Sequence, residues 1–454
     1  MKARNILICV MGSLLLPLCV ASCGEDRWAA YAEDTATDRW IYDTMRVYYY
    51  WNEEMPDFDH ANFFQAPATF FKSLLSPEDK FSTIDSLQGS TRAPLQDASC
   101  SYGFDFQLVS LKGQTYAHVL YALAGSPAQE AQLQRGSWIA AIDGEAVSKE
   151  NYARLYSGPA VQLLTGQYDP QGDSIRLHPQ PLRLPAARAV DDNPLLAASI
   201  LKADGRSVGY LAYNHFTPGP TAGNDAYNRL LLQVSGVWAE QGVQDVVLDL
   251  RYNTGGAVSC ANLLCTLLAP ATALGDTLGT LVFNANYRPK EHKLMLDPAL
   301  LQGTGRNLDL RRLYVLTGSY TASASEMVIN CLRPFMEVIQ IGQKTVGKNM
   351  GSLTFRNEEL MIEMHPLVCR LYNSLWESDY ASGFTPQYSL DELSDLPHFL
   401  PLGHPEETML ARALALILGS TDEAAATRSS SAACFTPLTT GSTFCRPHEL
   451  TIDR

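Results

Sequence analysis

The chain has 454 residues, enough for about two to four domains and a large buried core. Hydrophobic residues make up 46% of it and charged residues 18%, which is the composition of an ordinary globular protein. Asp and Glu outnumber Lys and Arg by 48 to 34, so the net charge is −14. A negative charge of that size repels phosphate groups and argues against nucleic acid as a partner.

The first 22 residues have the layout of an export signal. Lys2 and Arg4 precede an apolar run from residue 6 to residue 20, and small residues precede Cys23. Residues 20–23 resemble a bacterial lipobox, in which the cysteine is acylated and becomes the new N-terminus. We therefore expect a lipoprotein signal peptide over 1–22 and an exported bacterial lipoprotein, anchored to a membrane through Cys23 and facing the periplasm or the cell surface. A signal peptide cut elsewhere and an uncleaved anchor are the alternatives.

The other cysteines and the histidines do not form a recognisable metal motif. Seven cysteines remain if Cys23 is lipidated, so at least one thiol has no partner within the chain. None has Cys-x-x-Cys spacing, and no His-Glu-x-x-His sequence occurs. We expect no metal and no organic cofactor.

Residues 24–95 are expected to form a helical N-terminal region. Large apolar side chains recur from Trp40 to Trp51 at spacings close to a helical turn, and Pro56 interrupts the pattern. A second aromatic cluster follows between Phe63 and Leu74. This pattern predicts two or three short helices that pack on a larger body.

Residues 98–190 change to the period of β-strands and predict a small β-domain. Residues 104–109 and 116–123 are expected strands. Residues 125–128 predict a turn that opens a short helix, and residues 136–144 predict a strand that ends in an Asp-Gly turn.

Residues 205–420 alternate buried strands with helices. Strands are expected at 208–213, 246–250, 313–316 and 338–341, and helices at 225–241, 258–268 and 323–335. Strands that are apolar on both faces and separated by helices indicate a parallel-rich α/β core. The tail, 421–454, is rich in Ala, Ser and Thr and is expected to be loosely ordered.

Three segments carry groups suited to acyl transfer. Ser323 opens an expected helix, whose free N–H groups and dipole could stabilise an oxyanion, although Ser323-x-x-Glu326 is equally an ordinary capping box. Gly255 and Gly256 end a strand in a turn that could aim N–H groups at a ligand. Lys348 could act as a general base if burial lowers the pKa of its side chain. Lys348 also lies in a near-match to a phosphate-binding loop, but Asn349 replaces the required hydroxyl, so no nucleotide site is expected.

Together these segments resemble the C-terminal processing peptidases, also called tail-specific proteases. That family carries Thr-Ala-Ser-Ala-Ser-Glu, a lysine 25 residues after its serine in a Gly-Lys loop, and Asp-x-Arg-x-Asn-x-Gly-Gly upstream, which here are residues 321–326, Lys348 and residues 249–256. Residues 125–144 look like part of the PDZ domain that such peptidases carry. The resemblance covers about residues 40–420. It implies a crotonase-like α/β catalytic core preceded by a PDZ-like β-domain and a small helical region.

Carried over residue by residue, the resemblance implies that Ser323 is the nucleophile and Lys348 its general base. The backbone N–H of Ala324, with that of Gly255 or Gly256, would form the oxyanion hole.

The resemblance leaves one alternative nucleophile and includes three departures from the family's pattern. Ser325 is a competing nucleophile, although its spacing to Lys348 fits less well. Ser352 stands where several members have a glutamine that orients the lysine, and Gln132 and Ser137 replace the usual Gly and Asp of the PDZ signature.

The β-domain has a matching segment for a peptide terminus. Tyr102, Gly103, Phe104 and Asp105 match the loop whose amides bind a C-terminal carboxylate in the family. The sequence therefore predicts a serine endopeptidase that cleaves exported proteins near their C-termini. Its partners would be proteins or peptides with free C-termini. A catalytically weak or inactive peptide-binding protein on the same fold is the alternative.

Overall fold

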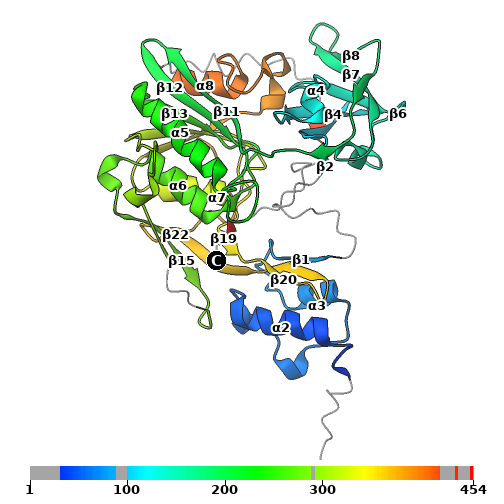
Figure 1. Ribbon diagram of the computed structural model, residues 1–454, viewed down its shortest axis with the longest axis vertical. Coiled ribbons are helices and arrows are strands. Elements are labelled where there is room, and N and C mark those ends of the chain that lie inside the picture. Colours follow the sequence, from blue (N-terminus) through cyan, green and yellow to red (C-terminus); the bar gives the residue numbers. More distant parts are fainter. Residues whose placement is uncertain (1–30, 88–99, 288–291, 420–434, 438–449, 453–454) are drawn as a thin grey trace, which may run out of the picture.

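The computed structural model describes residues 31–87, 100–287, 292–419, 435–437 and 450–452 (Figure 1). The predicted signal peptide and Cys23 lie outside the described residues. Among the helices that are described, none has the length and apolar character needed to cross a bilayer.

The α/β core is organised around a six-stranded sheet with the order β11–β12–β13–β17–β18–β23. Its strands are β11 (Leu195–Ala203), β12 (Arg206–Tyr213), β13 (Asp245–Asp249), β17 (Arg312–Thr317), β18 (Glu337–Gly342) and β23 (Tyr388–Ser389). All neighbouring pairs are parallel except β11 and β12. The prediction of a parallel-rich α/β core is confirmed.

Helices cover both faces of this sheet. The helices are α5 (Ala226–Glu240), α6 (Val258–Leu268) and α7 (Ala324–Leu332) on one side and α8 (Thr408–Ile417) on the other. Val246 and Leu248 of β13 belong to the apolar cluster formed with α5–α7, whereas Val247 packs in the cluster that contains Met409 and Leu410 of α8. Because both faces are buried, the strands are continuous apolar runs in the sequence.

A second six-stranded sheet, with the order β14–β25–β19–β22–β15–β16, lies below the first in Figure 1. Its strands are β14 (Gly256–Ala257), β25 (Leu450–Thr451), β19 (Met350–Ser352), β22 (Leu367–Asn373), β15 (Thr277–Phe283) and β16 (Lys293–Met295). β25 comes from the C-terminal tail, whose composition predicts no strand.

The N-terminal region packs at the lower end of the molecule in Figure 1. It contains α2 (Ala36–Tyr48), α3 (Pro67–Ser73) and two short 3-10 helices, Asn52–Glu54 and Phe58–His60. Tyr49, Phe63 and Phe70 are buried in the main core, as the helical pattern predicts, whereas Trp40 and Trp51 are half-buried against it. β1 (Thr83–Ser86) then pairs with β21 (Ile362–His365), which pairs with β20 (Phe355–Asn357), and this ties the region to the core.

The β-domain lies at the opposite end, with the main strand order β24–β3–β4–β5–β7–β8 (Figure 1). Its elements are β3 (Phe104–Leu111), β4 (Gln114–Ala122), α4 (Pro127–Glu130), β5 (Trp138–Ile142), β7 (Val161–Asp169), β8 (Ser174–Leu177) and β24 (Phe435–Pro437). It has its own apolar cluster, which includes Phe104, Phe106 and Leu133. β24 is a second strand from the C-terminal tail, and it pairs antiparallel with β3.

Gln132 ends the turn after α4 in a left-handed conformation, with φ +60°. The left-handed conformation costs a non-glycine residue about 1–2 kcal/mol. Glycine removes this strain, but it also raises the conformational entropy of the unfolded chain, which offsets part of the gain in stability. We therefore expect Gln132→Gly to raise the free energy of unfolding by up to about 1 kcal/mol in urea titrations. Gln132→Ala keeps the strain and should give no gain; an equal gain from Ala would show that the strain is not the cause.

Candidate active site

Ser323 occupies a strained position immediately before α7. Its φ is +62° and its ψ −114°, a conformation that a non-glycine residue rarely adopts. Its side chain is completely buried, and within the described residues its hydroxyl has no hydrogen-bond partner. The first N–H groups of a helix have no intrahelical acceptor, so the hydroxyl lies beside available donors.

Glu326 joins the start of α7 to the loop that carries Lys348. Its Oε2 accepts the backbone N–H of Ser323 at 2.8 Å and that of Lys348 at 2.7 Å. Its Oε1 accepts the hydroxyl of Thr345 at 2.6 Å and the N–H of Gly347 at 2.7 Å. One carboxylate therefore holds the backbones of the two predicted dyad residues next to each other.

The same contacts explain the capping-box pattern of Ser323 and Glu326. The two residues have the capping-box arrangement, but the Glu326 half is the one that forms a full hydrogen bond. Burial raises the pKa of Glu326, while the hydrogen bonds that it accepts lower the pKa in part. The capping interpretation is confirmed for Glu326, and capping by Glu326 leaves the Ser323 hydroxyl without a partner among the described residues.

Replacement of Glu326 by glutamine tests this arrangement. In Glu326→Gln the amide NH2 would face two of the four donors, and we expect a loss of about 2–4 kcal/mol in the free energy of unfolding. The control is Glu359→Gln, which removes the same charge from an exposed position. Thermal unfolding of both variants is the measurement, and equal midpoints would contradict the role of Glu326.

Asn253 fixes the glycine turn against the residues around Ser323. Its side chain accepts the N–H of Gly255 at 2.8 Å, and its backbone carbonyl accepts the N–H of Ala322 at 3.2 Å. The same carbonyl accepts the hydroxyl of Ser325 at 3.2 Å. The hydroxyl of Ser325 is thus committed to a structural contact, whereas the hydroxyl of Ser323 is not.

The two glycines of the turn are not equivalent. Both have positive φ, +118° for Gly255 and +135° for Gly256. A Cβ on Gly256 would lie 2.2 Å from the carbonyl oxygen of Phe216, so only glycine fits there. The N–H of Gly255 points at Asn253 Oδ1, whereas Gly256 begins β14.

Lys348 is buried at the other side of this site, with an exposed fraction of 2%. Its Nζ lies 5.7 Å from the ring centroid of Phe81, a residue of the N-terminal region. Ser352, the predicted orienting residue, lies in β19 and is also buried. The contact of Phe81 with Lys348 could not be predicted from the sequence, because it depends on how the N-terminal region packs on the core.

The predicted carboxylate loop, residues 102–105, lies in the β-domain, away from the α/β core that carries Ser323. Tyr102 donates its N–H to the carbonyl of Tyr156, and Asp105 Oδ1 accepts the N–H of Phe106. Gly103 has φ +74°, and a Cβ there would lie 2.3 Å from the Cβ of Ser126. Phe104 begins β3, so the loop lies at the start of the strand with which β24 pairs.

A buried ionic network that no sequence motif predicts connects the β-domain to the core. Arg251 binds Asp249, Glu392 at 2.9 Å and Glu407 at 2.6 Å. Arg135 of the β-domain binds Glu392 at 2.8 Å. The network resists sequence prediction because its members are separated by up to 272 positions.

The network makes a pH-dependent contribution to stability. Burial by itself would raise the pKa of Glu392, but Arg135 and Arg251 outweigh it and lower that pKa to about 2. A carboxyl whose pKa is lowered by folding stabilises the fold above its unfolded pKa, and this stabilisation is lost as the pH falls toward 2.

We therefore expect Glu392→Gln to be less stable than the wild type at pH 7, by an amount on the order of 2–3 kcal/mol. The difference should shrink as the pH falls from about 4.5 to about 2. Glu406→Gln is the control for the charge change, because Glu406 is exposed and directly precedes Glu407 of the network. Urea unfolding over this pH range checks it, and a constant difference would contradict the assignment.

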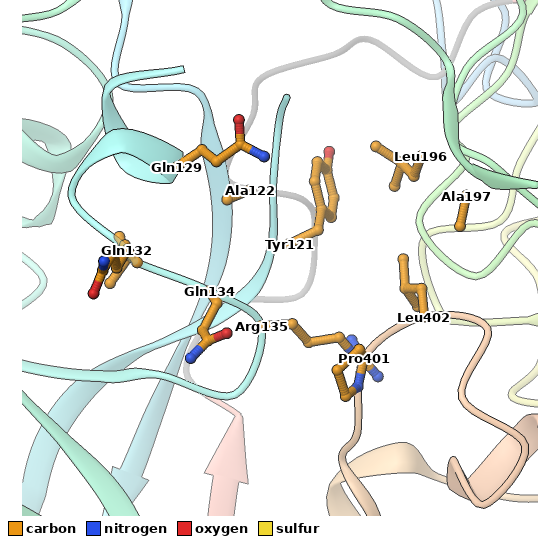
Figure 2. Close-up of a pocket in the computed structure, with 11 residues that line it drawn as sticks. Tyr121, Ala122, Gln129, Gln132, Gln134, Arg135, Leu196, Ala197, Pro401 and Leu402 are labelled. Atoms are coloured by element: carbon orange, nitrogen blue, oxygen red, sulfur yellow. The ribbon is translucent and has the colours of Figure 1, made fainter. Parts of the chain in front are cut away.

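A cavity of about 500 Å³ lies between the β-domain and the core. Figure 2 shows the side chains that line it. Its lining is Tyr121, Ala122, Gln129, Gln132, Leu133, Gln134 and Arg135 from the β-domain, and Leu196, Ala197, Pro401 and Leu402 from the core. It contains neither Ser323 nor Lys348. The cavity therefore lies at the contact between the two domains, and neither residue of the predicted dyad lines it.

No three His, Cys, Asp or Glu side chains gather as a metal site would require, within the parts of the chain that the structure describes. The five cysteines in those parts are free thiols, namely Cys100, Cys260, Cys265, Cys331 and Cys369.

Two family profiles match the chain. That of the peptidase S41 N-terminal domain matches residues 36–83, and that of peptidase family S41 matches residues 207–366. A solved structure of an S41-type protein from Bacteroides fragilis is 39% identical, with a TM-score of 0.77, over 84% of this chain and 98% of that one.

Two curated relatives are carboxyl-terminal-processing enzymes. The protease of Synechocystis sp. is 26% identical over 62% of this chain and 58% of its own length. The chloroplastic peptidase 1 of Arabidopsis thaliana is 25% identical over 52% of this chain and 45% of its own length. The chain thus spans about half the length of these relatives.

Proposed function

Because the chain belongs to peptidase family S41, we propose that it is a serine peptidase whose nucleophile is Ser323 and whose general base is Lys348. The observation that carries this proposal is the Glu326 carboxylate, which bonds to the backbone of both residues. The buried Ser323 hydroxyl without a partner adds support, since a nucleophile has to be available to its base.

In the proposed reaction, the Ser323 oxygen attacks the scissile carbonyl carbon and its proton passes to the Lys348 amine. Lys348 has to be neutral to accept it, and its burial disfavours the charged form. The protonated Lys348 then gives the proton to the leaving amine as the peptide C–N bond breaks, which leaves an acyl-enzyme on Ser323. Water, activated by Lys348, releases the acyl group.

The oxyanion would be bound by backbone N–H groups of Ala324 and Gly256. Ala324 is the first residue of α7, where the helix leaves N–H groups unpaired. Between the two glycines we favour Gly256, because the Gly255 N–H is already bonded to Asn253. Ser352, four residues after Lys348 in the sequence, would help to orient the lysine.

The finer parts of the proposal concern the substrate and its location. We propose that the β-domain is a PDZ-like domain in which residues 102–105 bind a free protein C-terminus, and that cleavage occurs near that end. The names of the curated relatives support C-terminal processing as the activity. We further propose export and lipid anchoring through Cys23, on the evidence of the N-terminal sequence.

The test uses the chain from residue 24 onward, a fluorophosphonate probe and an unfolded reporter protein with an apolar C-terminus. We expect Ser323→Ala to abolish labelling and Lys348→Ala to lower the hydrolysis rate by about 10³-fold or more, with folding intact in both. Ser325→Ala is the matched control and should keep its label. Labelling that persists in Ser323→Ala would overturn the assigned nucleophile.

A further inference from the structure

The C-terminal tail contributes a strand to the candidate active site. β25 lies between β14 and β19 and runs parallel to both. Leu450 pairs with Gly256, and Thr451 pairs with Ala257 on one side and with Ser352 on the other. The N–H of Ile452 donates to the carbonyl of Ser352 at 3.3 Å.

Both strands that flank β25 belong to the candidate site. β14 begins at Gly256, the proposed oxyanion residue, and β19 begins two residues after Lys348 in the sequence. A peptide held between two such strands is bound through its backbone, which suits an enzyme that must accept many sequences. β25 therefore occupies a position in which an extended polypeptide would pass the site.

The site is closed in this structure. Ser323 has an exposed fraction of 0% and Lys348 of 2%. Ile452 is half-buried and packs against the main apolar cluster. A Cβ added to Gly351 would lie 3.5 Å from the Cδ1 atom of Ile452, so the side chain of Ile452 lies close to β19. A substrate cannot reach Ser323 unless part of the structure that covers it moves.

The same tail also occupies the edge of the β-domain. β24 pairs antiparallel with β3, with Phe435 opposite Leu111 and Pro437 opposite Val109. Along β24 the chain therefore runs toward the end of β3 that carries Gly103. Strand addition of this kind is how an extended peptide binds an exposed sheet edge.

We propose that the C-terminal tail is an internal peptide that occupies the substrate's place, so that the protein is autoinhibited until β25 is displaced. The proposal rests on the proposed peptidase function. It also specifies the substrate class, an unfolded segment of polypeptide that inserts between β14 and β19, parallel to both strands.

Small changes in the tail test the proposal without altering the dyad. A chain that ends at residue 449 lacks β25. The variant Ile452→Pro lacks the backbone N–H that donates to the carbonyl of Ser352. The matched control, Ile452→Val, keeps that N–H. The rate of fluorophosphonate labelling at Ser323 reports access to the site. We expect a rise of about tenfold or more in the first two variants and no change in Ile452→Val. Unchanged labelling in a folded truncated chain would overturn the proposal.

A binding measurement separates this proposal from the proposed function. A fluorescent peptide of residues 446–454 is titrated into the truncated chain carrying Ser323→Ala, which needs no catalysis. Saturable binding of the peptide supports a strand site between β14 and β19, whatever the labelling experiment gives. Failure of the probe to label Ser323 in the truncated chain would count against the peptidase function instead. Absence of binding overturns the strand site. Cleavage of the tail from the chain in the wild-type protein, but not in Ser323→Ala, would make the tail a substrate and overturn its role as an inhibitor.

Discussion

The architecture of the site depends on one buried carboxylate. Glu326 accepts four hydrogen bonds, and two of them come from the backbones of Ser323 and Lys348. These residues lie on different elements, one at the start of α7 and the other in the loop after β18. The cost of burying the charge and the strain at Ser323 are both offset by a set of fixed backbone donors. A rigid arrangement of this kind suits catalysis, because little has to reorganise when charge develops.

The core was predictable because its local pattern and its burial agree. The strands around Val247 and Tyr314 are buried on both faces, which leaves continuous apolar runs in the sequence. The helix at 258–268 also begins and ends where the sequence predicts. The pairing of Ser323 with Lys348 has no such local cause, and it was predicted only through a resemblance of motifs. In the structure, the Glu326 carboxylate bonds to the backbones of both residues.

Contacts between distant segments could not be predicted. Phe81 lies over Lys348 because β1 pairs with β21, and no periodicity in the sequence announces that pairing. The strands β24 and β25 are short pieces of a tail whose composition suggests loose order. Strand pairing uses backbone groups that every residue except proline carries in full, so a short strand leaves little trace in side-chain identity.

The ionic network around Arg251 has a consequence for how the protein can be divided or recombined. Glu392 compensates two arginines at once, Arg251 of the core and Arg135 of the β-domain. A chimaera that received a foreign β-domain without an arginine at this place would leave Glu392 with one cation instead of two. A chimaera that carried this β-domain elsewhere would bury a guanidinium without its carboxylate, which is costly in free energy. The two domains are therefore joined as a matched pair, and their boundary is a poor place to exchange modules.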